Sequence, residues 1–229
     1  MNPRHVGTVA LACAAAVVVS GCVRVSDGLP VADGSVEPPG SAPGTSSTVP
    51  ANQPEPGIMP TSQAPVPAGT VTCAPEVAPR VGYVAAVDDL RAPQIVIGVP
   101  EGWSFMGGTG DVAGTLTGPE QMTATVTIAT TDLDPAAAFR GYADDIMEQS
   151  AVSAVSVLPG ELCSYSGQKL MGSWSDIPET AVEFRDRLVH LPTDTANYLV
   201  SVHVEAPSGV DALDAAGDVL TADFEVRMP

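Results

Sequence analysis

The chain has 229 residues, of which 27 are acidic and 9 are basic, so its formal net charge at pH 7 is −18. A surface of this charge repels the phosphates of nucleic acids and anionic lipid headgroups, which excludes nucleic-acid binding and electrostatic adsorption to a membrane. The length allows one domain of ordinary size together with segments outside it.

Residues 1–21 are typical of a signal peptide. Arg4 and His5 precede an apolar run at residues 6–19. A membrane-spanning helix needs about 20 apolar residues, so this run is too short to be one. Its length suits the apolar region of a signal peptide.

The apolar run ends with one cysteine after two small residues. The four residues are Val19-Ser20-Gly21-Cys22, and they resemble a bacterial lipobox, in which the cysteine thiol is acylated and the peptide bond before it is cut. We therefore predict that Cys22 becomes the mature N-terminus and anchors the protein on the outer face of the cytoplasmic membrane. Two or more acyl chains hold a protein there stably. An ordinary secretory signal with a chance cysteine is the alternative.

Residues 22–72 have the composition of a linker. They are rich in Pro, Ser, Gly and Thr and nearly lack large apolar side chains, so they cannot bury a core. A flexible coil of about 50 residues spans roughly 40 Å, which predicts a disordered stalk between membrane and domain. The composition changes at Cys73, and we predict one globular domain at residues 73–229.

The remaining cysteines predict a disulfide. Cys13 leaves with the signal peptide and Cys22 is acylated, which leaves Cys73 and Cys163 in an exported domain. A bridge between them would stabilise the fold by about 4 to 5 kcal/mol in the chain-entropy model. Two free buried thiols are the alternative. Neither cysteine lies in a CxxC pair, so thioredoxin-like and zinc-finger chemistry are not indicated.

The first part of the domain predicts a strand, a turn and a loop. Residues 94–99 form a short apolar strand that ends at Pro100. Trp103 follows in a turn, where we expect it to cap the core. The glycine-rich residues 106–114 are predicted to form a loop.

A second strand and a helix follow. Residues 121–130 alternate apolar and threonine side chains, which indicates a strand with one apolar face. Asp134 and Pro135 are typical of a helix start, because the carboxylate can cap the first turn and proline is tolerated there. The helix is predicted to extend to about residue 149, with Phe139 and Ile146 on its apolar face.

The second half of the domain is mostly strands. In the strand at residues 181–191, Phe184 and Leu188 are predicted to point inward, and Arg185 and Arg187 outward. The order of elements indicates an α+β domain, in which a mainly antiparallel sheet is packed by two helices. The further predicted strands are residues 151–158, 168–174, 197–206 and 224–228, and the second helix is residues 209–220, capped by Ser208.

Several of these features together resemble a known family. They are the strand that ends in Pro-Glu-Gly-Trp at residues 100–103, the helix that begins at Asp134, the consecutive strands and the last helix, behind a lipobox and a stalk. The chain in this respect resembles the LpqN/LpqT-type lipoproteins of actinobacteria, whose domain is similar to the PsbP-like fold. The scarcity of lysine and the abundance of Ala, Val, Gly and Asp also suggest a GC-rich genome.

The resemblance covers about residues 90–229 and implies a PsbP-like sandwich without enzymatic activity. Domains of this kind serve as assembly or accessory factors, and the LpqN type is linked to the mycobacterial cell envelope and its lipid export. Cys73 and Cys163 are not part of the family pattern. The family offers no catalytic residues to transfer.

Two motifs that could carry chemistry lack the structural context they need. Ser166 and Lys169 match the SxxK of penicillin-binding enzymes, but that serine must open a helix, whereas the residues that follow here are typical of a strand. The glycines at residues 107–114 are not followed by a helix, so they cannot form a phosphate cradle.

His190 and His203 remain after processing, with Asp186, Ser201 and Glu205 near them in the predicted strands. A zinc site or a Ser-His-Asp site would require the two histidines on one face. Alternation assigns His190 to the apolar face of its strand and His203 to the polar face of the next, so we predict that they do not meet. No metal and no cofactor are predicted.

Arg185 and Arg187 lie two residues apart on one predicted strand face. We expect them to pair with Glu183, Glu205 or another neighbouring acid. The alternative is a local basic surface that docks an acidic partner or a lipid headgroup.

These observations predict a membrane-anchored envelope lipoprotein that acts as a non-enzymatic adaptor for a membrane transport or assembly complex. Its partners would be the membrane, through the anchor at Cys22, and a protein of the envelope. The alternative is a carrier that binds an envelope lipid in an apolar groove between sheet and helix.

Overall fold

The computed structural model describes residues 55–59, 66–177 and 180–229. The predicted signal peptide, the predicted acylation site at Cys22 and most of the predicted stalk lie outside these residues. No helix within the described ranges is long and apolar enough to cross a membrane.

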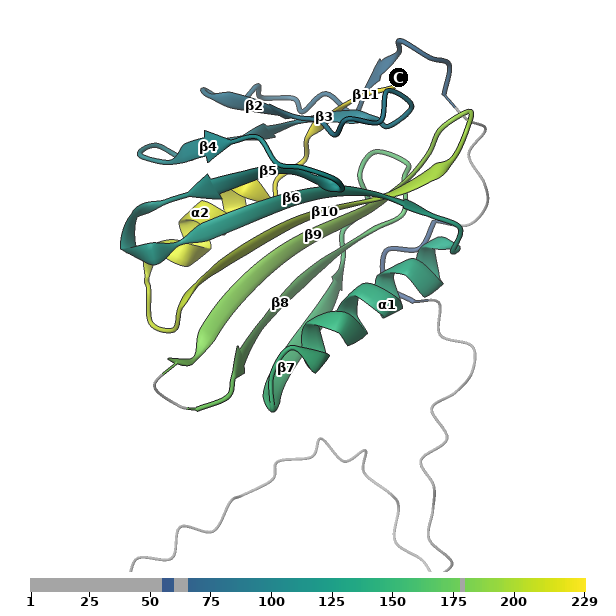
Figure 1. Cartoon of the computed structure of the whole chain (residues 1–229). Helices are drawn as coiled ribbons and strands as arrows, with labels where there is room; N and C mark the ends of the chain where they lie inside the picture. Colours follow the sequence, from purple (N-terminus) through teal and green to yellow (C-terminus); the bar gives the residue numbers. More distant parts are fainter. Residues whose placement is uncertain (1–54, 60–65, 178–179) are drawn as a thin grey trace, which may run out of the picture. The chain divides into compact units, whose positions relative to one another are not determined.

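Two antiparallel sheets form the frame of the domain (Figure 1). The larger has the strand order β4 (Ser104–Met106), β5 (Val112–Thr117), β6 (Thr123–Thr131), β10 (Asn197–Pro207), β9 (Val182–Pro192), β8 (Gly167–Ser175) and β7 (Val152–Pro159). The smaller has the order β1 (Val71–Thr72), β11 (Glu225–Arg227), β3 (Gln94–Gly98) and β2 (Gly82–Ala85). The helices are α1 (Pro135–Glu148) and α2 (Ala212–Leu220), with a 3-10 turn at Pro119–Gln121.

The main core lies between the small sheet and one face of the large sheet, and α2 packs on the same face. The alternating strands β6 and β10 turn their apolar side chains toward it, as their sequences predict. Among its best-buried members, each at most 1% exposed, are residues of β6, β10, β3 and α2: Val126, Val200, Val202, Ile95, Ile97 and Leu220.

Helix α1 covers the opposite face of the large sheet, over β7, β8 and β9 (Figure 1). The predicted cap is confirmed, because Asp134 Oδ1 accepts a hydrogen bond from the N–H of Ala137 at 2.9 Å. The apolar stripe of α1 forms a second core with β8 and β9, whose buried members are Phe139, Ile146, Leu170, Phe184 and Leu188. The two helices therefore lie on opposite faces of one sheet.

The predicted α+β class is confirmed, and each predicted strand has a counterpart. The loop predicted at residues 106–114 is partly wrong, because β4 ends at Met106 and β5 begins at Val112. Glycine is required by packing in β5, where a Cβ on Gly114 would lie 2.3 Å from the Tyr83 hydroxyl. Packing against another strand, rather than turn formation, therefore explains this glycine.

The second helix begins three residues later than predicted. α2 starts at Ala212 and is preceded by Asp211, whose side chain makes no capping hydrogen bond. Ser208, the predicted cap, donates its hydroxyl hydrogen to Glu183 Oε1 at 2.6 Å instead. The serine binds a neighbouring strand rather than the helix.

Strand β9 is buried on both faces, which corrects the prediction of one solvated face. It lies between β8 and β10, with α1 on one side and α2 on the other. Arg187 is consequently buried. The alternation of apolar and polar residues indicated the strand correctly, but it does not reveal how many layers cover it.

Residues 55–59 pack against the large sheet, and we call them the N-terminal strap. Gly57 O accepts a hydrogen bond from the N–H of Gly167 at 2.9 Å, and Pro56 O accepts one from Gln168 Nε2 at 2.9 Å. Ile58 packs against the second core. The strap and β1 belong to the folded unit, which therefore begins before the predicted boundary at Cys73.

Candidate functional site

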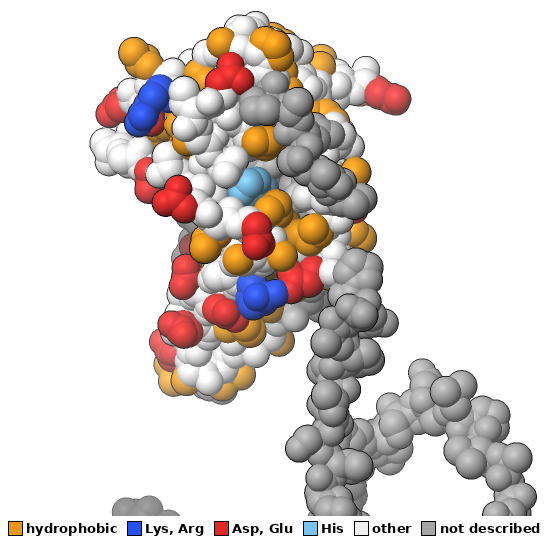
Figure 2. Space-filling model, turned by 90° about the vertical axis from the view of Figure 1, so that its right-hand side faces the viewer, with side chains coloured by type: hydrophobic (Ala, Val, Ile, Leu, Met, Phe, Trp, Pro, Cys, Tyr) orange, Lys and Arg blue, Asp and Glu red, His pale blue; other side chains and the backbone are white. Residues whose placement is uncertain are grey.

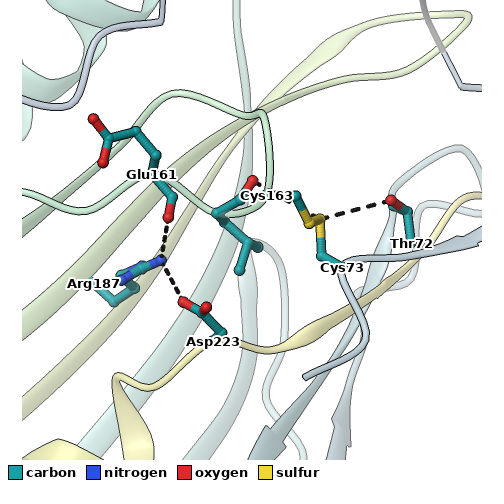
Figure 3. Close-up of a disulfide and its surroundings, with 7 residues drawn as sticks. Thr72, Cys73, Glu161, Cys163, Arg187 and Asp223 are labelled. Atoms are coloured by element: carbon teal, nitrogen blue, oxygen red, sulfur yellow. Dashed lines mark hydrogen bonds and ion pairs between the residues drawn. A yellow bond between two sulfur atoms is a disulfide. The ribbon is translucent and has the colours of Figure 1, made fainter. Parts of the chain in front are cut away.

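The structure joins Cys73 and Cys163 in a disulfide (Figure 3). Their Cα atoms are 5.6 Å apart, and 90 residues separate them in sequence. Cys73 follows β1 of the small sheet, whereas Cys163 lies between β7 and β8 of the large sheet. The bond therefore cross-links the two sheets, which is a structural role.

Arg187 supports the turn that contains Cys163. Its Nη2 donates to the main-chain oxygen of Glu161 at 3.0 Å and to Asp223 Oδ1 at 2.9 Å, as Figure 3 shows. Burial lowers the pKa of Arg187, and the charge of Asp223 opposes this effect. Because the side chain is only 2% exposed, the prediction that Arg187 points outward is wrong, and the alternative of a basic docking surface does not hold for this residue.

Arg185 is partly exposed and contacts α2. Its Nη2 lies 2.5 Å from Asp214 Oδ1, and its Nη1 donates to the main-chain oxygen of Phe184 at 3.0 Å. Both arginines thus pair with acids, but the partners come from α2 and the segment after it rather than from Glu183 or Glu205. A docking role for Arg185 stays a prediction.

The register of β9 and β10 corrects the prediction for the histidines. His203 is opposite Asp186, and His190 is opposite Leu199, so both histidines lie on the same face of the sheet. Four residues along β9 separate the two positions, which corresponds to about 13 Å. The prediction that the two histidines do not meet is therefore correct, but the reason given for it is wrong. They lie on the same face and are kept apart by their distance along the strands.

His203 belongs to a group of neighbouring polar side chains, which we call the polar cluster: Tyr142 of α1, Asp186 of β9, and Ser201, His203 and Glu205 of β10. His203 Nδ1 lies 2.6 Å from Asp186 Oδ1, and its Nε2 lies 3.3 Å from Glu205 Oε2. Within the described ranges, no group of His, Cys, Asp or Glu side chains is placed to hold a metal ion.

Burial and charge set the protonation of the polar cluster. Burial disfavours the charged imidazole, but the hydrogen bonds and charges of Asp186 and Glu205 outweigh it and raise the pKa of His203 to about 9. Burial raises the pKa of Asp186, which the imidazolium opposes. Burial and the charge of Asp186 also raise the pKa of Tyr142. At neutral pH the protonated imidazole therefore forms ion pairs with both carboxylates.

His190 borders a hollow at the N-terminal end of α1. Its Nε2 lies 3.1 Å from the main-chain oxygen of Leu133, and burial lowers the pKa of His190, which favours the neutral ring. The hollow has a volume of about 530 Å³ and is walled by the N-terminal strap, α1 and the ends of β9 and β10. Its lining is both apolar and polar, and includes Ile58, Leu133, Pro135, Pro192 and Ser166.

Ser166 and Lys169 do not form a catalytic pair. Ser166 is buried, and its Oγ accepts a hydrogen bond from the N–H of Met59 in the strap. Lys169 lies in β8, in the extended conformation that the sequence predicts. The one-turn helical spacing that the SxxK chemistry requires is therefore not present here.

Strand β7 is an outer edge of the large sheet, and its eight residues, VSAVSVLP, carry no charge. β8 pairs with one side of it, and no strand among the described residues pairs with the other. Val152 is 68% exposed and Leu158 is 42% exposed. The sequence predicted this strand but not its place at the edge, because the interior strands β3, β5 and β6 are equally free of charge.

Most charged groups of the protein are acidic, with 27 acidic and 9 basic residues in the chain. Figure 2 shows one face, on which more acidic than basic side chains surround scattered hydrophobic ones. An uncharged strand with an unpaired edge differs from such a surface, and proteins usually blunt exposed edges with charges or cover them. Among the uncharged edge strands β1, β2, β4 and β7, β7 is the longest, with eight residues, and it is therefore the strongest candidate for an interaction site.

Comparisons with known proteins bear on the fold. No protein-family model matches the chain, and no curated protein matches it in sequence. The crystal structure of LpqN, described as involved in cell envelope biogenesis of Mycobacterium tuberculosis, is similar with a TM-score of 0.50 and 19% identity, over 65% of this chain and 91% of that chain. A crystal structure from Bacteroides thetaiotaomicron matches with a TM-score of 0.35 and 14% identity, over 59% of this chain and 45% of that chain, which is too slight for an argument. The domain thus has a distant LpqN-like fold.

Proposed function

We propose that the protein is a membrane-anchored accessory factor of the cell envelope, whose domain binds a protein partner without catalysing a reaction. The observation that carries the proposal is the uncharged, exposed strand β7 on a domain of strongly acidic composition. The lipobox-like residues ending in Cys22 support an anchor, and the fold is similar to that of LpqN, a protein described as involved in cell envelope biogenesis.

The histidines that could suggest an enzyme have hydrogen-bond partners inside the domain. His203 is held between Asp186 and Glu205, and His190 faces the main-chain oxygen of Leu133. A general base needs a free lone pair within reach of a substrate. Both ring nitrogens of His203 are engaged, which argues against a general base there, whereas the neutral ring of His190 donates through Nε2 and keeps a lone pair on Nδ1.

Site-directed photo-crosslinking in cells tests the proposal. A photoreactive amino acid replaces Leu158 on β7 in the full chain, and irradiation is expected to yield one defined adduct with an envelope protein, identified by mass spectrometry. Leu90 is the matched control, because it is also an exposed leucine, but it lies between β2 and β3 of the small sheet. Adducts of equal yield from both positions, or none from Leu158, would overturn the proposal.

The hollow beside His190 supports a second candidate function, a carrier for an envelope lipid. Its volume of about 530 Å³ lies within the range of small-molecule sites, about 300 to 1,000 Å³. The predicted groove between sheet and helix is filled by Phe139, Phe184 and Leu188, so a ligand would enter the hollow instead. Mass spectrometry of organic extracts of the purified protein separates the two candidates, because a carrier would retain a stoichiometric lipid.

A further inference from the structure

We propose that β7 binds an extended, uncharged segment of a partner protein, flanked by basic residues, as an additional strand of the large sheet. This inference rests on the proposed function, because it specifies how the partner docks. Three features of β7 support it: an unpaired backbone edge, uncharged and exposed side chains, and acidic residues at both ends of the strand.

The turn after β7 establishes which backbone groups pair with β8. The N–H of Gly160 donates to the main-chain oxygen of Gly167 at 3.0 Å, so Gly160 is a hydrogen-bonded position of this hairpin. Hydrogen-bonded positions alternate along an antiparallel strand, which assigns Leu158, Ser156 and Ala154 to the side that faces β8.

The intervening residues of β7 therefore turn their N–H and C=O groups away from the sheet. They are Ser153, Val155 and Val157, and Pro159, which has no N–H, fits the same series. No strand among the described residues meets this edge. An unpaired row of this kind is a template for a strand from another chain.

The side chains of β7 do not protect the edge. The strand has no charged residue and no proline before Pro159, and both would hinder pairing. Val152, Val157 and Leu158 are at least 38% exposed, and Met171 of β8 is 36% exposed beside them. The partner segment that fits these side chains is uncharged and rich in β-branched residues.

Acidic residues lie at both ends of β7. Glu148 ends α1 just before the strand, and Asp176 lies at the same end, because its Oδ1 accepts the N–H of Ala151 at 3.2 Å. Glu161 follows the strand at the other end, and all three acids are exposed. Lys169 is the one basic residue in the sequences of β7 and β8. This excess of acidic over basic residues around β7 favours a partner segment that has basic residues on both flanks.

The same charges disfavour a second copy of this chain. Two β7 strands paired antiparallel would bring Glu148 and Asp176 of one copy against Glu161 of the other. Like charges placed opposite each other destabilise a sheet pair. A heterologous partner with basic flanks replaces this repulsion with attraction.

Binding of synthetic peptides to the full chain in detergent micelles tests the charge preference. The first probe has alternating Val and Thr residues with lysines at both ends, and the second has the same core with glutamates. The lysine-flanked probe is expected to bind about tenfold more tightly or better at low salt, with the difference shrinking as salt is added. Equal affinities would overturn the proposed recognition of basic flanks.

Amide hydrogen exchange at single-residue resolution tests strand addition itself. The N–H groups of Ser153, Val155 and Val157 are expected to exchange rapidly without the lysine-flanked probe and slowly with it. Those of Ala154 and Ser156 should be protected in both states. Binding of the probe without new protection of the outward amides would overturn strand addition.

A pair of substitutions at one outward position completes the test. Val157→Pro removes an outward N–H and is expected to weaken probe binding about tenfold or more, because proline is tolerated at an edge but cannot donate. Val157→Thr keeps the N–H and should change binding by about threefold at most. Retained protection of Ala154 and Ser156 verifies that β7 still pairs with β8 in both variants.

The outcomes separate this inference from the proposed function. If Leu158 crosslinks a partner in cells while the outward amides stay unprotected by any probe, the adaptor role holds and strand addition fails. If the probes bind as expected but Leu158 traps nothing, the adaptor role fails. Self-association of the full chain that Val157→Pro abolishes would overturn the choice of a heterologous partner.

Discussion

The polar cluster shows how one buried cation is stabilised in a very acidic protein. The side chain of His203 is 19% exposed and that of Asp186 is fully buried, so their 2.6 Å contact is poorly screened by water. Removing one member of such a pair leaves the other charge buried without compensation, which is costly. Thr123 donates to Glu205 Oε1 at 3.2 Å and thereby holds the second carboxylate in place.

The stability of the protein is expected to fall with rising pH because of His203. Its pKa is about 9 in the folded state and about 6.5 in an unfolded chain, so its contribution is complete below pH 6.5 and is lost as the pH rises through 9. The free energy of unfolding should fall by on the order of 2 kcal/mol between pH 7 and pH 9. Urea unfolding at a series of pH values measures this.

His203→Gln provides the comparison for this pH dependence. The variant retains the other titrating groups near His203, namely Asp186, Glu205 and Tyr142, but lacks the imidazole. Its free energy of unfolding should be lower at pH 7 and should change little up to pH 9. Parallel pH profiles for the wild-type protein and the variant would contradict the assignment of a raised pKa to His203.

The N-terminal strap depends on a glycine for its docking. Gly57 has a φ of +74°, and a Cβ there would lie 1.8 Å from the main-chain oxygen of Gly167. The strap also carries Glu55, which forms an ion pair with Arg140 of α1. A short segment of this kind stays in place only if its backbone can approach β8 closely.

Gly57→Ala is expected to release the strap without unfolding the domain. The free energy of unfolding should fall by about 1 to 2 kcal/mol more than in Gly69→Ala, because the strap loses its hydrogen bonds to β8. Gly69 is a matched control, since its φ is also +74° but nothing lies within 4 Å of a Cβ built on it.

Amide exchange of Gly167 reports the release directly, because this N–H donates to Gly57 at 2.9 Å. It should exchange faster in Gly57→Ala and at the wild-type rate in Gly69→Ala. Equal exchange in both variants would show that the strap does not depend on the close approach of Gly57.

Across the whole domain, the disulfide and Arg187 act at the same turn. Cys163 connects this turn to the small sheet, and Arg187 connects it to Asp223 between α2 and β11. Segments from the beginning, the middle and the end of the domain therefore meet there (Figure 3). This explains how a two-residue strand such as β1 stays paired with β11.

Removal of the disulfide by Cys73→Ser with Cys163→Ser is expected to lower the free energy of unfolding by about 2 to 5 kcal/mol, because the unfolded chain regains the entropy of a long loop. Denaturant unfolding measures the change. A reductant should lower the stability of the wild-type protein to that of the variant and should not affect the variant. A wild-type protein insensitive to reductant, with both thiols shown to be free, would contradict this.

The amino-acid sequence by itself determined the elements whose signals are local. Alternation identified β6, β9 and β10, and Asp134 with Pro135 identified the start of α1, because a strand face or a helix cap depends on residues only a few positions apart. The pairing of Cys73 with Cys163 could also be predicted, since the other two cysteines were assigned elsewhere. These features, with the lipobox-like residues at Cys22, support the fold class and the proposed location.

Only the tertiary structure decided what covers each strand and which strand stays uncovered. β9 proved central, so Arg187 is buried, and β7 proved to be an edge, so its uncharged run became the candidate site. The same-face placement of His190 and His203 and the docking of Gly57 also depend on register and on contacts between distant segments. A periodic pattern indicates that one face of a strand is apolar. The order of strands and the layers that cover them depend on pairing between distant segments, which no short stretch of sequence encodes.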